Sequence, residues 1–340
     1  MDDDFAGVAH SRFNRRHDFK VMAEDLSHYL VIAVSSRALF DLEMENAIFE
    51  KEGAEAYEKY QIEHEEEVLK PGPGFPLVQA ILKLNSTIKE RRKAEVVIIS
   101  RAGPSVALRI MNSIKHQKLD ITRAAFCKGT PVSRYLDAYS VTLFLSRHRQ
   151  DVRTALNSKI AAGLLYASPP SYTEPLNEIR IAFDADAVVF SDESERVYKE
   201  KGLAAFLLHE ETNARKPLPE GPFAKLLRAL SFLQNSKDKG EIGIRTALIT
   251  ARNSPAHERV IRTLRSWRVD VDEMFFMGGV SKQKVIKAFN PHIFFDDQAV
   301  HCEPAAEVAP TAIVPTDYKP GEVARPKQEE KPLANLQPGI

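Results

Sequence analysis

Short apolar runs alternate with longer segments of mixed polarity along most of the chain. The runs are rich in Val, Ile, Leu and Phe, which is typical of strands that are buried on both faces of a parallel sheet. The segments predicted as strands are 30–34, 96–100, 124–127, 142–145, 163–166, 179–183, 245–250 and 292–297, and those predicted as helices include 42–68, 77–84, 105–116 and 132–139. This alternation predicts an α/β fold.

The same order of segments occurs twice. Ile32 in the first half aligns with Ile181 in the second, 149 residues later. Other pairs that keep this offset are Gly53 with Gly202 and Gly72-Pro73 with Gly221-Pro222. A chance overlap of two β-α patterns would not keep register through the Gly-Pro turn. We therefore predict an internal duplication of α/β units of roughly 140 residues each.

Changes in composition suggest where the units begin and end. A segment rich in Pro and Ser separates the two halves, and the end of the chain is rich in Pro, Lys and Glu. The predicted organisation is a flexible N-terminus (1–25), a first half (26–167), a linker (168–178), a second half (179–316) with a small helical cap at about 194–238, and a disordered tail (317–340).

Polar residues follow three predicted strands of the second half. Asp184 and Asp186 come just after the first strand, and Thr250 ends the next. The remaining candidates are Lys282 and the acidic pair Asp296 and Asp297. Because the carboxyl ends of parallel strands meet at one edge of the sheet, we expect these side chains to lie together. An isolated Asp-x-Asp is often only a capping turn, but this order of groups indicates phosphoryl transfer, with Lys284 as the alternative lysine.

The segments FDADAV, LITAR and FFDD, together with Lys282, resemble the motifs of the haloacid-dehalogenase phosphatase superfamily. More closely, five segments between Leu30 and Val314 look like the cytosolic 5′-nucleotidase I family. They are VIAVSSRALFDLE, PGPGFPLVQAI, FDADAVVFSDESE, KPLPEGP and PHIFFDD. The chain departs from the expected motif at Ala185, where the family has glycine, but alanine is small enough for the turn to form. The resemblance implies duplicated haloacid-dehalogenase-like Rossmannoid units with parallel sheets and a small helical cap.

The resemblance also implies Mg²⁺-dependent hydrolysis of nucleoside 5′-monophosphates, such as AMP or IMP, through an aspartyl-phosphate. Asp184 would attack phosphorus and Asp186 would transfer the proton, while Thr250 and Lys282 would bind phosphate oxygens. The implied metal ligands are Asp184, the backbone carbonyl of Asp186, Asp296 and Asp297. Two other classes stay open at this point: a phosphatase for another small phosphate ester, such as a sugar phosphate, and a non-enzymatic nucleotide-binding regulator.

Four further residues of the second half are candidates for contact with the substrate. Asn213, Arg215 and Lys216 lie at the end of the predicted cap, and Arg252 follows the second strand. The alternative for the cap residues is a position on a solvated helix end.

The first half lacks the acidic residues of the second. Ser35, Arg37, Ser100 and Arg147 stand where the second half has Asp184, Asp186, Thr250 and Asp297. Such a half cannot form an aspartyl-phosphate, but hydroxyl and guanidinium groups could accept a phosphate directly. The candidate effector phosphate site consists of Ser35, Arg37, Ser100, Arg134 and Arg147. The alternative is that these arginines form structural ion pairs with Asp41, Glu43 and their neighbours.

Composition limits the remaining classes. The 340 residues carry 47 basic and 47 acidic side chains, and this balance argues against nucleic-acid wrapping and against adhesion to an anionic membrane. Two cysteines are too few for a disulfide framework, and no apolar run approaches the length of a bilayer span. We expect a cytoplasmic protein whose partners are a nucleotide substrate and a nucleotide effector such as ADP. Whether it is a homo-oligomer stays open.

The effector hypothesis predicts a second nucleotide site that does not depend on the acidic residues. Binding of ADP, measured by calorimetry, should persist in Asp184→Asn and disappear in the double variant Arg37→Ala with Arg147→Ala, because the two guanidinium groups would supply the phosphate contacts. A single site in every variant would contradict the hypothesis.

Overall fold

The computed structural model describes residues 25–86, 93–169, 172–173, 175, 178–235 and 242–317. Apart from residues 25 and 317, the predicted flexible N-terminus and disordered tail lie outside the described residues, and the predicted linker is described only in part. The strands of the first half are β1 (Leu30–Val34), β2 (Ala94–Ser100), β3 (Arg123–Phe126), β4 (Leu143–Ser146) and β5 (Ala161–Leu165). Those of the second half are β6 (Glu178–Phe183), β7 (Gly243–Thr250), β8 (Glu273–Phe276), β9 (Ile293–Asp296) and β10 (Thr311–Ile313).

The helices surround these strands in the same order in each half. In the first half they are η1 (Leu26–His28), α1 (Ser36–Leu39), α2 (Glu43–Glu52), α3 (Ala54–Glu63), α4 (Phe75–Ser86), η2 (Pro104–Val106), α5 (Ala107–His116), α6 (Ser133–Leu136) and α7 (Arg149–Asn157). In the second half they are the short helical turn η3 (Ala185–Val189), α8 (Glu193–Thr212), α9 (Ala224–Gln234), α10 (His257–Trp267), α11 (Gln283–Phe289) and α12 (Ala299–Ala306).

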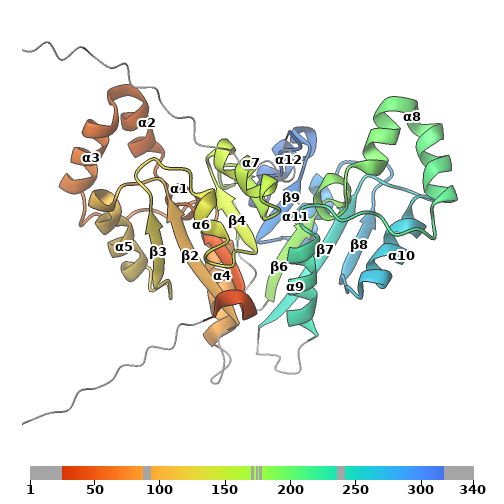
Figure 1. The fold of residues 1–340 in the computed structure, drawn as a ribbon, viewed down its shortest axis with the longest axis horizontal. Helices are drawn as coiled ribbons and strands as arrows, with labels where there is room; N and C mark the ends of the chain where they lie inside the picture. Colours follow the sequence, from red (N-terminus) through yellow and green to blue (C-terminus); the bar gives the residue numbers. More distant parts are fainter. Residues whose placement is uncertain are drawn as a thin grey trace, which may run out of the picture.

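The two halves share one sheet. Within the described ranges, ten strands follow the order β3-β2-β1-β4-β5-β10-β9-β6-β7-β8. Neighbours within each half are parallel, whereas β5 and β10 join the halves as an antiparallel pair in which Leu165 lies opposite Ala312. The predicted α/β fold is confirmed (Figure 1). The sequence did not indicate whether the two halves form separate sheets or a shared one, and in the structure they share one sheet.

The duplication is visible in a pair of charges at each outer edge of the sheet. Arg123 of β3 and Glu95 of β2 form an ion pair at 2.8 Å. In the second half Arg245 of β7 and Glu273 of β8 form the corresponding pair at 3.1 Å, with acid and base exchanged. Each half therefore keeps the attraction between its two outer strands although the residues have changed.

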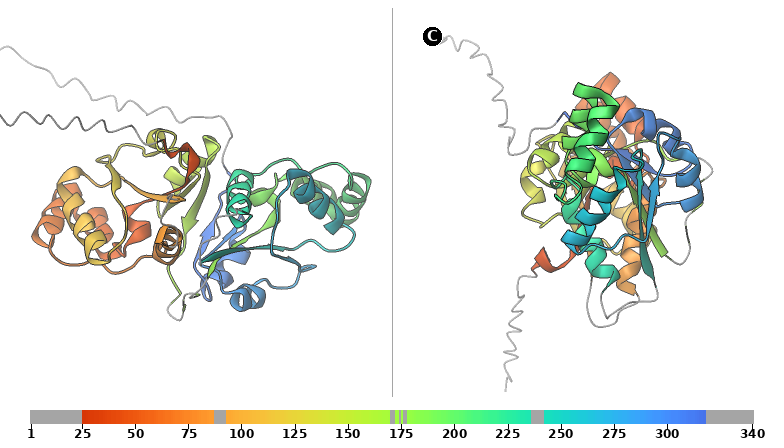
Figure 2. Two further views of the ribbon diagram at one scale, coloured as in Figure 1. Left: turned by 90° about the horizontal axis from the view of Figure 1, so that it is seen from below. Right: turned by 90° about the vertical axis from the view of Figure 1, so that its right-hand side faces the viewer.

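Apolar side chains form a continuous core through both halves. Phe144 of β4 and Phe295 of β9 are fully buried in the same cluster. Helix α4 of the first half contacts β2 and also β6 of the second half. Helices cover both faces of the sheet (Figure 2). Among the helices of the described residues, none combines the length and the apolar character that a bilayer span requires.

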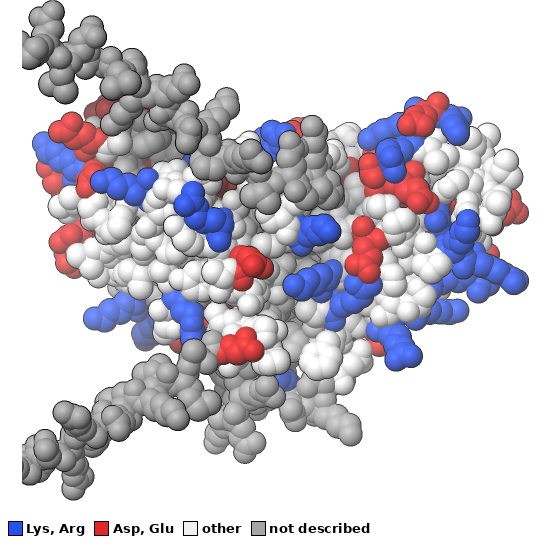
Figure 3. Space-filling model, viewed as in Figure 1, with Lys and Arg blue, Asp and Glu red and all other residues white. Residues whose placement is uncertain are grey.

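Acidic and basic side chains are mixed over the face of the molecule seen in Figure 3. Neither sign covers that face, as expected from equal numbers of acidic and basic residues.

A helical segment rises from the same side of the sheet in each half, α2 with α3 in the first and α8 in the second (Figure 1). Each is bent at a glycine with positive φ, Gly53 at 88° and Gly202 at 78°. Glycine adopts this conformation without the steric cost that a Cβ brings. The single helical segment predicted for 42–68 is therefore two helices, because Gly53 breaks it.

Gly221 lies where the segment after α8 passes close to the first turn of the second half. A Cβ at this position would lie 2.2 Å from the carbonyl oxygen of Phe190 and 2.5 Å from that of Val188. We expect Gly221→Ala to lower the free energy of unfolding by about 2 kcal/mol or more, because backbone must shift to relieve the overlap. Gly243→Ala is the matched control, since a Cβ there would meet no atom within 4 Å. Urea denaturation of the two variants measures the difference, and equal stabilities would contradict the close approach.

Candidate active site

Asp184 lies where β6 ends and the chain turns into η3. Its backbone N–H donates to the carbonyl oxygen of Phe295 at 2.7 Å, which ties the turn to the neighbouring strand β9. Ala187 within the turn has φ of 59°. Ala185 is fully buried in the apolar core, so the turn forms with alanine at the position where glycine was expected.

Lys282 lies between two carboxylates. Its Nζ donates to Asp184 Oδ1 at 2.6 Å and to Asp296 Oδ2 at 2.7 Å. Burial alone would lower the pKa of Lys282, but the two carboxylates raise it above its usual value, so the side chain stays positively charged. The alternative lysine, Lys284, lines a separate cavity of about 480 Å³ together with Arg180.

Asp184, Asp296 and Asp297 form a buried acidic cluster. One oxygen atom from each lies within 4.8 Å of the others. Asp297 Oδ1 is buried and has no hydrogen-bond partner among the described residues. Three carboxylates against one lysine leave an excess of negative charge that a divalent cation would balance, and carboxylate oxygens suit a hard cation. The residues present therefore fit a divalent metal ion.

The three carboxyl groups differ in how their charge is compensated. Burial raises the pKa of Asp184 to about 7, although Lys282 opposes the shift. Burial likewise raises the pKa of Asp296 against the same lysine. Asp297 is less well compensated, and burial together with the charge of Asp184 raises its pKa to about 9. Raised pKa values mean that these carboxyl groups tend to hold protons, and a bound cation would displace those protons.

Thr250 ends β7 and is almost completely buried. Its Oγ1 accepts a hydrogen bond from the backbone N–H of Arg252 at 3.3 Å. Because the oxygen accepts this bond, the hydroxyl proton can be donated to a ligand.

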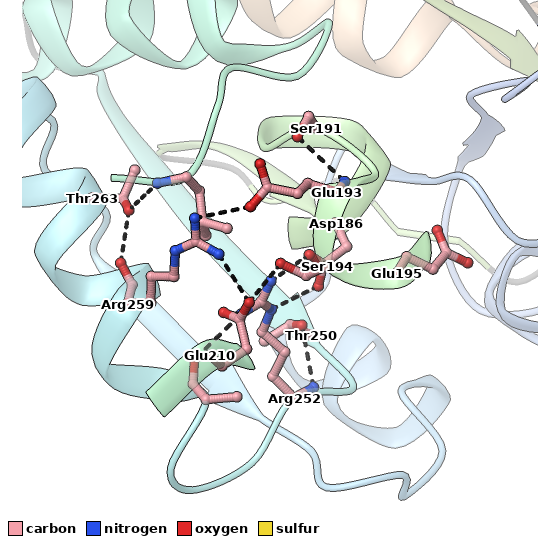
Figure 4. A network of polar contacts seen from close by, with 12 residues as sticks. Asp186, Ser191, Glu193, Ser194, Glu195, Glu210, Thr250, Arg252, Arg259 and Thr263 are labelled. Carbon is pink, nitrogen blue, oxygen red and sulfur yellow. Dashed lines mark hydrogen bonds and ion pairs between the residues drawn. The ribbon is translucent and has the colours of Figure 1, made fainter. Parts of the chain in front are cut away.

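The carboxylate of Asp186 is held by Arg252 (Figure 4). Arg252 Nε donates to Oδ2 at 2.8 Å and Nη2 donates to Oδ1 at 2.6 Å. The remaining nitrogen, Nη1, donates to Glu210 of α8. Burial would lower the pKa of Arg252, but Asp186 and Glu210 raise it. Arg252 was a candidate for substrate contact, and in this structure its guanidinium is paired with these two carboxylates.

Glu210 receives hydrogen bonds from several sides, and sequence patterns do not single it out. Its Oε1 accepts from Ser194 Oγ at 2.8 Å and from Arg259 Nη1 at 3.0 Å (Figure 4). Arg259 Nη2 also donates to Glu193 at 3.0 Å. Burial would raise the pKa of Glu210, but the arginines and Ser194 lower it, so the group is a carboxylate. The one signal in the sequence is the repeat, which aligns Arg259 with Arg109.

The three candidate substrate residues of the predicted cap lie at or just after the end of α8. Asn213 Nδ2 donates to the carbonyl oxygen of His209 at 2.8 Å, within its own helix. Arg215 and Lys216 are exposed, and the Lys216 carbonyl oxygen accepts from Arg259 Nε at 3.0 Å. Within the described residues no hydrogen bond or ion pair joins the three side chains to the acidic cluster. Their role in substrate contact stays a prediction.

Two of the candidate effector-site arginines, Arg37 and Arg147, share one carboxylate. Arg37 Nη2 donates to both oxygens of Glu43 at 3.1 Å, and Arg147 Nη2 lies 3.3 Å from Glu43 Oε1. The ion-pair alternative therefore describes their contacts in this structure.

The other candidates of the effector site are arranged around this pair. Ser100 Oγ lies 2.8 Å from Ser36 Oγ, and Arg134 is exposed with its guanidinium over the ring of Tyr135. Ser35 Oγ is buried without a hydrogen-bond partner among the described residues, and so is the Nε of Arg37. The effector site stays a prediction.

Comparison with known proteins decides the family. A family model described as 5′-nucleotidase matches residues 22–320. The chain belongs to the 5′-nucleotidase family. The resemblance to the cytosolic 5′-nucleotidase I family is thereby confirmed, and it is supported by human cytosolic 5′-nucleotidase 1B, which is 34% identical over 293 residues. No solved structure matches this family member.

The aligned region covers a larger share of this chain than of the human protein. It covers 83% of this family member and 48% of the human protein. The chain thus spans about half the length of the curated relative that it matches. All the acidic cluster residues and Lys282 lie inside the region matched by the family model.

Asp297 should destabilise the metal-free fold. The pKa of the Asp297 carboxyl rises from an ordinary value of 3.8 to about 9 in the folded protein, so between these pH values the group must take up a proton on folding. The folded state therefore loses stability progressively as pH rises from about 4 to 9. We expect Asp297→Asn to raise the melting temperature in a metal-chelating buffer. The gain in the free energy of unfolding should be on the order of 2 kcal/mol near pH 8 and smaller at pH 5.

Asp296→Asn is the matched comparison because it removes a neighbouring buried carboxyl group that, unlike Asp297 Oδ1, is hydrogen-bonded at both oxygens. Asp296 accepts from Lys282 and from the backbone N–H of Gln298, so its loss should lower the melting temperature. Scanning calorimetry at the two pH values measures both variants. A lower melting temperature for Asp297→Asn would contradict the assignment of an uncompensated buried carboxyl.

Proposed function

We propose that this protein hydrolyses nucleoside 5′-monophosphates, such as AMP or IMP, to nucleoside and phosphate in a Mg²⁺-dependent reaction. The observation that carries the proposal is the position of Lys282 between Asp184 and Asp296. Lys282 is a fixed cation beside Asp184, which would be the nucleophile, and beside Asp296, which would be one of the metal ligands. Membership of the 5′-nucleotidase family supports the choice of substrate.

The reaction divides into two steps that both use Asp184. In the first, an Asp184 oxygen forms a bond to phosphorus while the bond from phosphorus to the 5′-oxygen breaks. Asp186 must take up a proton from solvent before this step, and it passes that proton to the leaving oxygen. In the second, water attacks phosphorus, its proton passes to Asp186, and the bond to Asp184 breaks. Nucleoside and phosphate leave, and both aspartates return to their starting state.

The remaining groups act on the transferred phosphoryl oxygens. Lys282 and the free hydroxyl proton of Thr250 would stabilise the charge that these oxygens carry in the transition state. Asp184, Asp296 and Asp297, with the backbone carbonyl of Asp186, would hold Mg²⁺. The ion would supply positive charge to phosphate oxygens and would compensate the Asp297 carboxylate.

The division of labour between the halves is part of the proposal. Residues 179–316 would carry out the reaction, with the segment at about 194–238 as a cap. Residues 26–167 would serve as a non-catalytic half, because serine and arginine stand there at the positions where the second half has its aspartates. Arg37 and Arg147, which converge on Glu43, are the groups that a phosphate of an effector would have to engage there.

Asp184→Asn should abolish turnover, with a loss of at least about 10⁴-fold, because an amide cannot form the phosphoryl bond. Phosphate release from AMP and IMP with Mg²⁺ measures the effect. Asp192→Asn is the matched control, since Asp192 is an exposed aspartate of the same segment. Activity of Asp184→Asn close to that of the wild type would refute the nucleophile.

A substrate panel separates the remaining alternatives. Wild-type protein should release phosphate from nucleoside 5′-monophosphates with Mg²⁺ and should lose the activity in EDTA. Release only from sugar phosphates would keep the chemistry and reject the nucleotide substrate. A folded protein that releases phosphate from neither class would be better described as a nucleotide-binding regulator.

A further inference from the structure

Arg252 fixes the carboxylate of Asp186 in both position and rotation. Two parallel hydrogen bonds, of 2.6 and 2.8 Å, join the guanidinium edge to the two carboxylate oxygens. A single bond would leave the carboxylate free to turn, whereas this fork does not. Arg252 is itself immobile because only 2% of its side chain is exposed and its guanidinium lies 5.5 Å from the centre of the Phe206 ring.

The cap anchors this arginine from the opposite side. Glu210 accepts from Arg252 Nη1 and from Arg259, and its side chain is completely buried. It lies on the part of α8 that follows the bend at Gly202. Asp186, Arg252 and Glu210 therefore form one chain of charges that runs from the turn after β6 to the cap (Figure 4). Arg252 and Glu210 are buried, whereas the side chain of Asp186 is 17% exposed.

The first half contains the counterpart of Arg259. Arg109 is buried and donates from Nε to the carbonyl oxygen of Glu67, as Arg259 donates to that of Lys216 at the aligned position. Its Nη1 donates to Glu45. A buried arginine that ties the helical segment to the sheet is thus present in both halves, whether or not an acidic cluster accompanies it.

The chain of charges has no such counterpart. The first half has Arg37, Ala102 and Gln61 at the positions of Asp186, Arg252 and Glu210. All three members are absent together from the half that lacks the nucleophile. The first half has an arginine fork at the neighbouring position, where Arg101 donates to both oxygens of Asp151. That fork joins the end of β2 to α7 and does not reach the helical segment, so the link from the turn to the cap is particular to the second half.

We propose that Arg252 is the positioning residue for Asp186, and that Glu210 anchors it to the cap. This inference rests on the proposed function, in which Asp186 gives a proton to the 5′-oxygen in the first step and takes a proton from water in the second. Arg252 acts through Asp186 and needs no contact with the substrate. The position of the cap thereby determines where the proton-transferring group lies.

A double-mutant cycle on Asp186 and Arg252 tests this dependence. Arg252→Met should lower kcat for AMP about 10- to 100-fold with little change in KM, since proton transfer contributes about 10²- to 10⁴-fold and a displaced carboxyl forfeits part of it. In an Asp186→Asn background, Arg252→Met should cost less than about 3-fold, because the group that it positions is already gone. Losses that multiply in the double variant would overturn the proposal.

The leaving group supplies a second readout. 4-Nitrophenolate departs without a proton. In single-turnover measurements, which isolate the first step, Arg252→Met should therefore slow the release of 4-nitrophenolate much less than the release of adenosine from AMP. Equal loss on both substrates, or a raised KM with unchanged kcat, would instead assign Arg252 to substrate binding. Should the wild type not accept 4-nitrophenyl phosphate, the cycle on AMP decides alone.

Arg259→Met is the matched control, since Arg259 holds the same Glu210 without touching Asp186. It should lower the melting temperature and leave the ratio of the two activities unchanged. Arg252→Lys keeps a cation beside Glu210 but cannot form the fork, so it should reproduce the kcat loss if Arg252→Met does not fold. Wild-type protein without activity on nucleotides would remove the proposed function and this inference with it, whereas an active wild type with multiplying losses would remove the inference alone.

Discussion

A buried lysine shared by two carboxylates is the interaction on which the site depends. Asp184 and Asp296 end neighbouring parallel strands, so the order of the sheet forces two negative charges together in a region closed to water. Lys282 offsets part of their repulsion, and Asp297 remains without such a partner. The fold therefore brings together charges that it cannot balance with protein groups alone, and this deficit gives a cation and a phosphate a reason to bind.

The first half shows that the scaffold does not require these charges. Val132 and Ser146 stand at the positions aligned with Lys282 and Asp296, and both are buried. The same strand order forms there with an apolar residue and a hydroxyl in place of an ion pair. Since buried ion pairs often stabilise a fold less than apolar residues of the same size, the charged version is best explained by chemistry.

The strand segments and the acidic motif could be predicted from the sequence because each rests on local signals. Apolar runs mark β1 and β6, and the carboxyl ends of adjacent parallel strands place Asp184 near Asp296 without further information. The pairing of Arg252 with Asp186 could not be read in this way, because it depends on which rotamer a long side chain adopts between two segments 66 residues apart. Nor does any local pattern indicate that β5 and β10 join the halves, since a strand of three residues carries little periodicity.

The antiparallel pair of β5 and β10 makes the completion of the sheet a late event during synthesis. Leu164 and Leu165 of β5 leave the ribosome long before their partners Ala312 and Ile313 exist. Until then the first half presents an unpaired, apolar strand edge of the kind that recruits other chains. A contact so distant in sequence also forms slowly. The nascent protein therefore passes through a period in which a chaperone that covered the edge of β5 would prevent aggregation. This period ends only when β10 pairs with β5.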